Sequence, residues 1–355
     1  MKNEKKNIRE LSAEEISAWL TEIGEKPFRS KQIIEWLWKK GAGSWDEMTN
    51  VSLPLREQLA KNFSLPSISI DVRQKSKDGT IKLGFKTHDG QMIEGVLIPR
   101  DDRLTACVSS QVGCSLTCSF CATGRLGLNR NLNFDEIFDQ VVLINREAMK
   151  NFGKPLTNIV FMGMGEPLLN YSQVIRAIDK ITSPQGLGIS PRRITVSTAG
   201  IAKMIKKLGD DKVRFRLALS LHAANDKKRN VIMPINETNN IRVLIEALDY
   251  FFGKTKNRIS YEYVMLRDFN DSEKDALELA EICRKVPVKV NLIEYNTVAE
   301  SGYKPSDSRR VLAFQKILID KNITATIRRS RGRDIDAACG QLANKSSVSG
   351  LEAKV

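Results

Sequence analysis

Three cysteines in one short segment constrain this chain more than any other feature of its sequence. Cys114, Cys118 and Cys121 follow one another at the spacing CxxxCxxC. Three thiolates can bind three irons of a four-iron cluster and leave the fourth iron open, whereas clusters that only carry electrons use four cysteines. The spacing therefore predicts a cluster that binds a ligand at its open iron.

Zinc is the main alternative for this cysteine triplet. A structural zinc site needs a fourth ligand, and neither histidine, His88 or His222, lies at a zinc-finger spacing from the cysteines. A disulfide framework is disfavoured because six cysteines in 355 residues are sparse and the N-terminus has no apolar signal segment. We therefore expect a cytoplasmic protein with reduced thiols, and no apolar run predicts a membrane span.

The chain is strongly basic. It contains 56 lysines and arginines against 42 aspartates and glutamates, a formal net charge of +14. Such a charge favours a polyanionic partner, because binding releases counterions that had condensed on the polyanion. Nucleic acid is the partner that we expect, and a basic surface that is only solvated is the alternative.

The first 99 residues indicate a separate accessory domain. Helical periodicity predicts three helices, at residues 12–24, 29–40 and 53–62. Three runs with strand periodicity follow, at residues 68–75, 80–87 and 91–98. The pairs Asp78-Gly79 and Asp89-Gly90 separate these runs and are strong hairpin signals. We expect three helices followed by antiparallel hairpins.

From about residue 103 the pattern alternates between strand and helix. The predicted strands are 104–109, 158–162, 194–198, 215–221, 259–266 and 288–294. The predicted helices are 134–150, 171–182, 201–208, 240–252, 272–285 and 307–320. Six β/α units predict a parallel sheet, for which we favour an open (β/α)6 partial TIM-type barrel over a doubly wound sheet. This core is assigned to residues 100–335, and residues 336–355 form a C-terminal cysteine loop and tail.

Polar residues at the carboxyl ends of the predicted strands are candidates for a binding site, because the sites of parallel β/α folds lie there. Gly165 and Glu166 follow the second strand in the segment Gly-Met-Gly-Glu-Pro. A glycine there lets the backbone approach a ligand, and the glutamate could accept a hydrogen bond from an ammonium group. Later strand ends carry Ser197, Ser220, His222 and Asn296. Each of these is otherwise explained as a satisfied polar cap.

Two further cysteines stand out. Strand alternation places Cys107 opposite Leu104 and Ala106, so that its thiol can face the barrel interior; a small buried hydrophobe is the alternative. Cys339 follows four arginines, Arg328, Arg329, Arg331 and Arg333, on a segment without regular periodicity, which we interpret as a mobile loop. Basic neighbours would lower the pKa of its thiol and bind phosphates. Cys283, in an apolar helix, is expected to be inert.

The chain resembles the RlmN/Cfr family of radical S-adenosylmethionine (SAM) RNA methyltransferases. The resemblance is carried by the motifs CxxxCxxC, GMGEP and DIDAACGQL in this order, and by Cys107, which lies seven residues before the first cluster ligand. The resemblance spans the chain from the N-terminal helices to Leu342. One departure is the stretch 297–303, where many relatives have a proline-rich loop.

The resemblance implies most of the chemistry. One [4Fe-4S] cluster on the cysteine triplet would bind SAM, with contacts from Gly165, Glu166, Ser197, Ser220, Leu221, His222 and Asn296. Two SAM molecules would serve each turnover, one as methyl donor and one as radical source. The substrates would be adenosines of 23S rRNA and of tRNA, just 3' of the anticodon, and the domain at 1–99 would bind RNA.

The implied mechanism uses three more residues. Cys339 is methylated first, and its activated methyl group adds to carbon 2 of the adenine. Cys107 then attacks the Cys339 sulfur, which releases RNA and leaves a disulfide to be reduced. Glu94 matches the proposed base of the family, although an exposed strand carboxylate is the plainer interpretation. We expect a monomer that receives electrons from flavodoxin or ferredoxin.

Two alternatives remain open from the sequence. A relative of Cfr would methylate carbon 8 of adenosine with cysteines in equivalent places. A noncatalytic RNA-binding protein with a zinc-stabilised loop is the alternative from another class. Iron content and SAM cleavage discriminate between the enzyme and the zinc protein.

Overall fold

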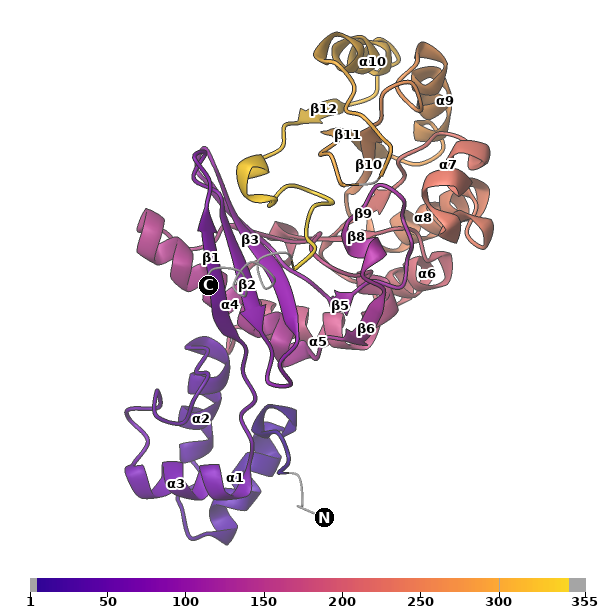
Figure 1. Cartoon of the computed structure of the whole chain (residues 1–355). Coiled ribbons are helices and arrows are strands. Elements are labelled where there is room, and N and C mark those ends of the chain that lie inside the picture. The colour runs from indigo at the N-terminus through magenta and orange to yellow at the C-terminus, as the bar shows by residue number, and fades with distance from the viewer. Residues whose placement is uncertain (1–4, 300, 345–355) are drawn as a thin grey trace.

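The computed structural model describes residues 5–299 and 301–344. A helical N-terminal module is followed by one ten-stranded sheet, whose outer side is covered by helices (Figure 1). The order of strands in the sheet is β1-β2-β3-β4-β7-β8-β9-β10-β11-β12. None of the described helices is both long enough and apolar enough to cross a membrane.

The N-terminal module contains the three predicted helical segments. They are α1 (Ala13–Glu22), α2 (Arg29–Ile34) with its continuation η2 (Glu35–Lys39), and α3 (Leu53–Asn62). A short turn, η1 (Ile8–Glu10), precedes them and was not predicted. A capping box starts α1, because the Ser12 hydroxyl accepts from the Glu15 amide and the Glu15 carboxylate accepts from the Ser12 amide. The hydroxyl and carboxylate thereby satisfy two amides that the first helical turn leaves unpaired.

Helix α4 (Phe134–Phe152) joins this module to the rest of the molecule. Arg9 is fully buried, and its Nη1 donates to Oδ2 of Asp139 on α4 over 2.9 Å. The ring of Trp38 lies 5.7 and 5.1 Å from the rings of Phe134 and Phe138. A buried ion pair and a set of aromatic ring contacts therefore attach the N-terminal module to α4.

The antiparallel strands are β1 (Ser69–Lys75), β2 (Ile81–Lys86) and β3 (Met92–Arg100). Gly79 and Gly90 have positive φ angles of 87° and 81°, as the predicted turns require. β3 also pairs antiparallel with β4 (Arg103–Cys107). The hairpins are therefore continuous with the parallel sheet. The predicted domain division at residue 99 lies inside β3, where Pro99 is paired with Leu104 of β4.

The barrel contains the six predicted β/α units. Its strands are β4, β7 (Asn158–Phe161), β8 (Ile194–Thr198), β9 (Arg216–Ser220), β10 (Ile259–Met265), β11 (Val288–Glu294) and β12 (Ala325–Arg328). Their helices are α4, α5 (Tyr171–Thr182), α6 (Ala202–Asp210), α7 (Asp226–Ile232), α8 (Ile241–Thr255), α9 (Glu273–Cys283) and α10 (Ser308–Asp320). The seven strands are parallel and follow chain order. A doubly wound sheet would reverse that order, so the partial barrel is confirmed.

Shorter elements complete the described chain. β5 (Gln111–Gly113) and β6 (Leu128–Asn131) form a separate antiparallel ribbon. Single turns of helix occur at η3 (Thr123–Arg125), η4 (Pro167–Asn170), η5 (Pro191–Arg193), η6 (Pro234–Glu237) and η7 (Arg333–Ile335). The sequence did not predict β12, because a four-residue strand that ends in arginine has little apolar periodicity. Part of the predicted C-terminal tail, 345–355, lies outside the described residues.

We predict that Asp139→Ala destabilises the protein by about 3–5 kcal/mol, because the fully buried Arg9 would lose its counter-charge. The free energy of unfolding, measured by urea titration, tests this value. The control is Glu246→Ala, which removes the exposed partner of Arg242 on α8 and should cost only about 0–1 kcal/mol. Equal losses in the two variants would contradict a structural role for the Arg9–Asp139 pair.

Candidate active site

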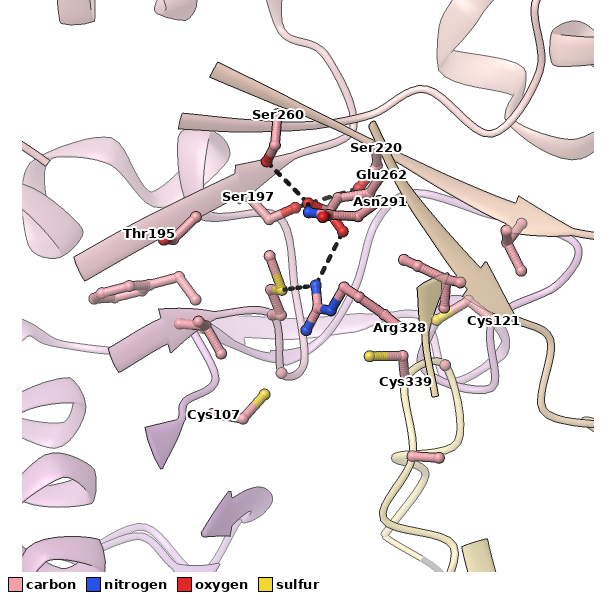
Figure 2. Close-up of a pocket in the computed structure, with 18 of the residues that line it drawn as sticks. Cys107, Cys121, Thr195, Ser197, Ser220, Ser260, Glu262, Asn291, Arg328 and Cys339 are labelled. Carbon is pink, nitrogen blue, oxygen red and sulfur yellow. Dashed lines mark hydrogen bonds and ion pairs between the residues drawn. The ribbon is translucent and has the colours of Figure 1, made fainter. Parts of the chain in front are cut away.

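A cavity of about 620 Å³ lies inside the partial barrel, and most of the predicted site residues line it (Figure 2). Those that do are Cys107, Cys114, Cys118, Cys121, Gly165, Glu166, Ser197, Ser220, His222 and Cys339. Glu94, Leu221 and Asn296 are not part of its lining. The carboxyl ends of the strands thus meet the cysteine triplet and the C-terminal segment in one space.

The β5–β6 ribbon carries the cysteine triplet at its tip. Cys114 directly follows β5, and its amide donates to the carbonyl of Gly127 over 2.9 Å. Gly113 has a φ of +78°, and a Cβ there would lie 1.9 Å from the Gly127 carbonyl oxygen. Only glycine allows the two ribbon strands to approach so closely before the loop begins.

The three thiols of the triplet lie in one shared site. Burial raises the pKa of Cys114 to about 11, and it also raises the pKa of Cys118. The nearby Cys121 adds to both shifts, so the thiols share one site. Two thiolates on one zinc ion lie at most about 4.6 Å apart. In the described ranges 5–299 and 301–344, the thiols do not converge within 4.8 Å, whereas a cubane binds each cysteine at a separate iron.

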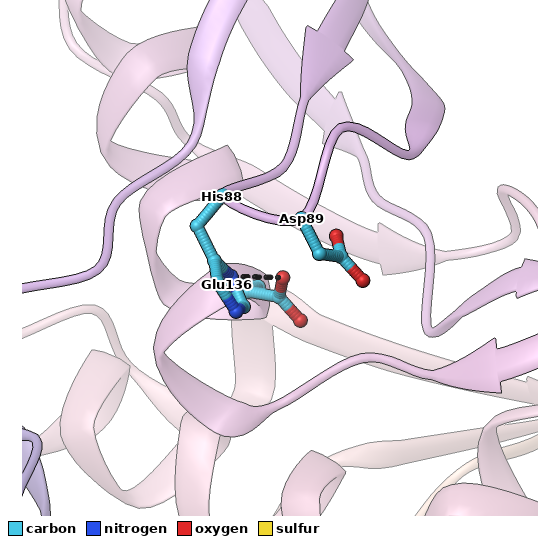
Figure 3. A group of neighbouring side chains, drawn as sticks. All are labelled: His88, Asp89 and Glu136. Atoms are coloured by element: carbon cyan, nitrogen blue, oxygen red, sulfur yellow. Dashed lines mark ion pairs between the residues drawn. The ribbon is translucent and has the colours of Figure 1, made fainter. Parts of the chain in front are cut away.

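A different trio of side chains does converge within 4.8 Å, namely His88, Asp89 and Glu136 (Figure 3). Arg130 already provides the cation, since its Nε lies 2.7 Å from Asp89 and its Nη1 lies 2.8 Å from Glu136. Glu136 also accepts from the Asn133 amide at the start of α4. This cluster therefore joins the hairpin turn to α4 as an ion-pair network.

The glycine-rich segment after β7 lies directly against the segment after β4. The Gly163 amide donates to the carbonyl of Val108 over 3.1 Å, and Met164 donates to the Ser109 hydroxyl over 2.8 Å. A Cβ on Gly163 would lie 2.7 Å from the Val108 oxygen. In this structure Gly163 thus allows contact between two segments of the protein itself, which the sequence did not predict.

Glu166 is buried at the end of this segment. Its Oε1 accepts from the Leu168 amide over 3.0 Å, and its Oε2 accepts from the Ala199 amide over 2.7 Å. Burial is the largest cause of its raised pKa, and these hydrogen bonds oppose the shift. Each carboxylate oxygen retains a lone pair, so the group can still accept from a ligand in the cavity.

The ends of β8 and β9 contribute hydroxyl and imidazole groups. The oxygens of Ser197 and Ser220 lie 3.3 Å apart. His222 is in the left-handed region with φ of 57°, and its Nδ1 accepts from the Val264 amide over 3.1 Å. Burial, followed by the charge of Arg229, lowers the pKa of His222 to about 3, so the ring is neutral at pH 7. The Leu221 side chain instead packs in the hydrophobic core.

Asn296 lies just beyond β11 and contacts the C-terminal cysteine. Its Nδ2 donates to the Cys339 carbonyl over 3.3 Å. Its Oδ1 is buried and has no hydrogen-bond partner among the described residues. An unpaired buried acceptor is costly, and SAM carries an ammonium group that could donate to it. The side chains present therefore fit a bound SAM.

Cys107 and Cys339 face the same cavity from opposite elements, β4 and the C-terminal segment (Figure 2). Both are free thiols, as are the other four cysteines, so the disulfide is absent from this state. Burial raises the pKa of Cys107 to about 12. Cys339 is exposed, and the surrounding protein raises the pKa of its thiol by desolvation. The charge of Arg328 lowers the pKa of Cys339, as expected for a basic neighbour, and opposes this shift.

The segment around Cys339 has no long helix or strand, yet it is attached at several points. The Ala122 amide donates to the carbonyl of Gly340 over 2.8 Å, and Thr123 Oγ1 donates to the carbonyl of Leu342 over 2.7 Å. Upstream, Ser76 Oγ donates to Asp334 Oδ1 over 2.6 Å. The cysteine loop and the β1–β2 turn therefore hold this segment over the cavity.

Two family models match this chain. The Ribosomal RNA large subunit methyltransferase N-terminal domain matches residues 6–65, and the Radical SAM superfamily matches residues 108–280. A probable dual-specificity RNA methyltransferase RlmN of Cytophaga hutchinsonii is 58% identical over 341 residues, which cover 96% of this chain and 93% of that protein. Its counterpart in Christiangramia forsetii is 53% identical, over 98% of this chain and 99% of that protein.

The chain belongs to the RlmN family of radical SAM RNA methyltransferases. The fold agrees, since the crystal structure of a radical SAM methyltransferase from Sphaerobacter thermophilus matches with a TM-score of 0.90 and 41% identity, over 95% of this chain and 99% of that one. An RlmN enzyme depends on SAM, and radical SAM proteins hold a [4Fe-4S] cluster. The noncatalytic zinc protein is thereby set aside.

Glu94, the base expected in an RlmN enzyme, lies behind the C-terminal segment. It is 1% exposed, so the interpretation as an exposed strand carboxylate is wrong. Lys82 Nζ lies 3.4 Å from Oε1, and the amides of Ala343 and Asn344 donate to Oε2 over 2.9 and 3.2 Å. Alternation along β3 did not reveal this burial, because the amides of Ala343 and Asn344 that cover Glu94 follow 249 and 250 residues later.

Two buried charged residues of this RlmN chain were not predicted as site residues. Arg229 on α7 is fully buried and donates to the carbonyls of Ala199 and Leu221, which ties the ends of β8 and β9 together. Glu262 on β10 faces the cavity. The sequence could have indicated Glu262 as a site residue, because it is a glutamate inside an otherwise apolar strand. It could not have indicated Arg229, because the surrounding helix is polar and has the sequence pattern of an exposed helix.

We predict that Cys107 is a neutral, unreactive thiol at pH 7, because burial raises its pKa to about 12. Its alkylation rate in cluster-loaded protein should rise about tenfold per pH unit from pH 7 to 10, since only the thiolate reacts. Iodoacetamide labelling with mass spectrometry measures this rate. Cys283 is the matched control, because burial also raises its pKa to about 12, so its alkylation rate should show the same dependence on pH. A rate for Cys107 that levels off below pH 9 would contradict the prediction.

Proposed function

We propose that this protein methylates carbon 2 of adenosine in 23S rRNA and in tRNAs, at the position 3' of the anticodon. The supporting observation is that Cys107 and Cys339 line one cavity with the cysteine triplet, although they come from opposite ends of the core. The two relatives described above are named as dual-specificity RNA methyltransferases. The net charge of +14 also suits an RNA substrate.

The cavity would hold SAM between the cysteine triplet and the strand ends. Cys114, Cys118 and Cys121 would hold the cluster, which when bound supplies the electron that converts SAM into a hydrogen-abstracting radical. Glu166 offers acceptors for the SAM ammonium group. Asn296 Oδ1 lacks a partner among the described residues but lies outside the cavity lining, so its side chain would have to turn toward the cavity to accept as well. Gly165, Ser197, Ser220 and His222 line the same space, and Leu221 could contribute only its backbone.

The Cys339 thiol would accept the methyl group of a first SAM molecule. Its methyl carbon, activated with a second SAM molecule, would then bond to the adenine ring, so that the RNA is held covalently. Cys107 would attack the Cys339 sulfur to break the bond between that sulfur and the methylene carbon. These reaction steps require two thiols in one cavity, and Cys107 and Cys339 both line the cavity. The resulting disulfide would need reduction before the next turnover.

Glu94 would accept the proton of the ring carbon. Its carboxylate is held by Lys82 and by the amides of Ala343 and Asn344, directly beside the cavity-lining Leu342. The C-terminal segment would have to shift for this carboxylate to reach a base in the cavity. A monomer supplied with electrons by flavodoxin or ferredoxin completes the proposal.

Methylation of carbon 8, as in Cfr, is the second candidate, because the same thiol pair serves both reactions. We predict 2-methyladenosine and no 8-methyladenosine in RNA treated with the reconstituted enzyme, SAM and reductant. Chromatography and mass spectrometry of RNA nucleosides separate the two products. RNA from a strain that lacks the gene serves as the unmethylated substrate, and a dominant 8-methyl product would refute the proposal.

We predict opposite outcomes for the two thiol variants. Cys339→Ala should form no methylated adenosine and no adduct, because the carrier sulfur is absent. Cys107→Ala should accumulate a covalent protein–RNA adduct, because the second thiol is needed for release. Denaturing gel electrophoresis with labelled RNA measures the adduct, and Cys283→Ala is the control that should turn over normally. Recovery of Cys107→Ala free of RNA after turnover would contradict these roles.

A further inference from the structure

A network of hydrogen bonds, buried at Ser260, Glu262 and Asn291, occupies the wall of the cavity between β10, β11 and β12. The Glu262 carboxylate accepts from Ser260 Oγ over 2.9 Å, from Asn291 Nδ2 over 2.7 Å and from Arg328 Nη1 over 2.9 Å. Thr326 Oγ1 donates to Asn291 Oδ1 over 2.7 Å. Every polar side chain of this network is therefore engaged, and together they fix the Arg328 guanidinium in place.

The Arg328 guanidinium still has donors to offer. Nη1 contacts Glu262 and the sulfur of Met162, but no described residue accepts a hydrogen bond from Nε or Nη2. Figure 2 shows the side chain reaching into the cavity beside Cys339, with Cys107 on the far side. Its charge also acts on both thiols. The unused edge of Arg328 thus faces the space between the two cysteines.

The pair of Arg328 and Glu262 has no net charge, because the carboxylate compensates the guanidinium. The cavity wall also carries Arg216, Arg258 and Lys289, so a phosphate has other cations to bind in the same cavity. A planar guanidinium with two unused N–H groups suits a neutral acceptor on a flat ring, such as a ring nitrogen of a nucleobase. If the proposed function holds, the reacting carbon must lie within reach of Cys339 and Cys107, which is where this edge points.

We propose that Arg328 is a substrate-binding residue that positions the target adenine between Cys339 and Cys107, and that Glu262 is the positioning residue for Arg328. This inference rests on the proposed function and deepens it. It assigns to this arginine a contact with the base itself. Methylation of Cys339 by the first SAM precedes entry of the base, so it should not need Arg328.

The test compares two steps in cluster-loaded Arg328→Gln. Methylation of Cys339 without RNA, measured by mass spectrometry, should stay within about twofold of the wild type, while methylation of adenosine should fall by about tenfold or more. Arg328→Lys should restore only part of the loss, because lysine lacks the planar fork. Arg309→Gln removes an exposed arginine on α10 and should leave both steps unchanged.

Glu262→Gln tests the positioning role. It should reproduce the separation between the two steps, and the double variant Glu262→Gln with Arg328→Gln should lose no more than Arg328→Gln alone. Additive losses would refute the coupling between the two residues. Equal loss of Cys339 methylation in Arg328→Gln would assign the arginine to SAM binding instead, and normal adenosine methylation would exclude any role in positioning.

A fluorescence measurement separates this inference from the proposed function. RNA with 2-aminopurine at the target adenosine should brighten when the wild-type protein unstacks the base, and Arg328→Gln should lose most of that increase at saturating protein. Wild-type protein that methylates no adenosine would overturn the proposed function, while the fluorescence comparison would still decide the role of Arg328. No brightening with wild-type protein, or equal brightening with both, would overturn the inference.

Discussion

Two hydrogen bonds between distant parts of the chain determine whether the candidate site exists at all. The Ala122 amide binds the Gly340 carbonyl, and the Thr123 hydroxyl binds the Leu342 carbonyl, 219 positions away in sequence. Both are formed beside the cysteine triplet, so the loop that would hold the cluster also holds the segment that carries Cys339. Because an unpaired buried polar group costs about 1–3 kcal/mol, these contacts favour a Cys339 thiol that faces the cavity.

Charged side chains lie in and behind the wall of the barrel cavity, and the structure compensates two of them. Glu262 neutralises Arg328 on the cavity wall, and Arg229 is satisfied by carbonyl oxygens at the ends of β8 and β9. A buried charge that lacked such partners would be strongly destabilising. These networks hold the cavity open as a binding site in the place where an ordinary core would be filled by apolar side chains.

Much of the fold followed from local sequence patterns. The predicted limits of β8, β11 and α5 agree with the structure, because long periodic segments between glycines and prolines have few alternatives. The pairing of β3 with β4 did not follow, although only two residues separate these strands, because a domain boundary was expected at residue 99. The short strand β12 did not follow either, since it depends on β11, whose paired residues lie 35 positions earlier in sequence. The same reason explains Glu94, whose partners are Lys82 and the amides of residues 343 and 344.

The sequence by itself determined the type of chemistry, because the spacing of Cys114, Cys118 and Cys121 is a covalent property of the chain and limits what three thiols can bind. It also determined the six β/α units, which depend on local periodicity. Only the tertiary structure decided which groups share the cavity, that Cys107 is buried with a raised pKa, and that Arg328 is paired with Glu262. Desolvation and long-range pairing arise when distant segments pack together, and no local pattern encodes them.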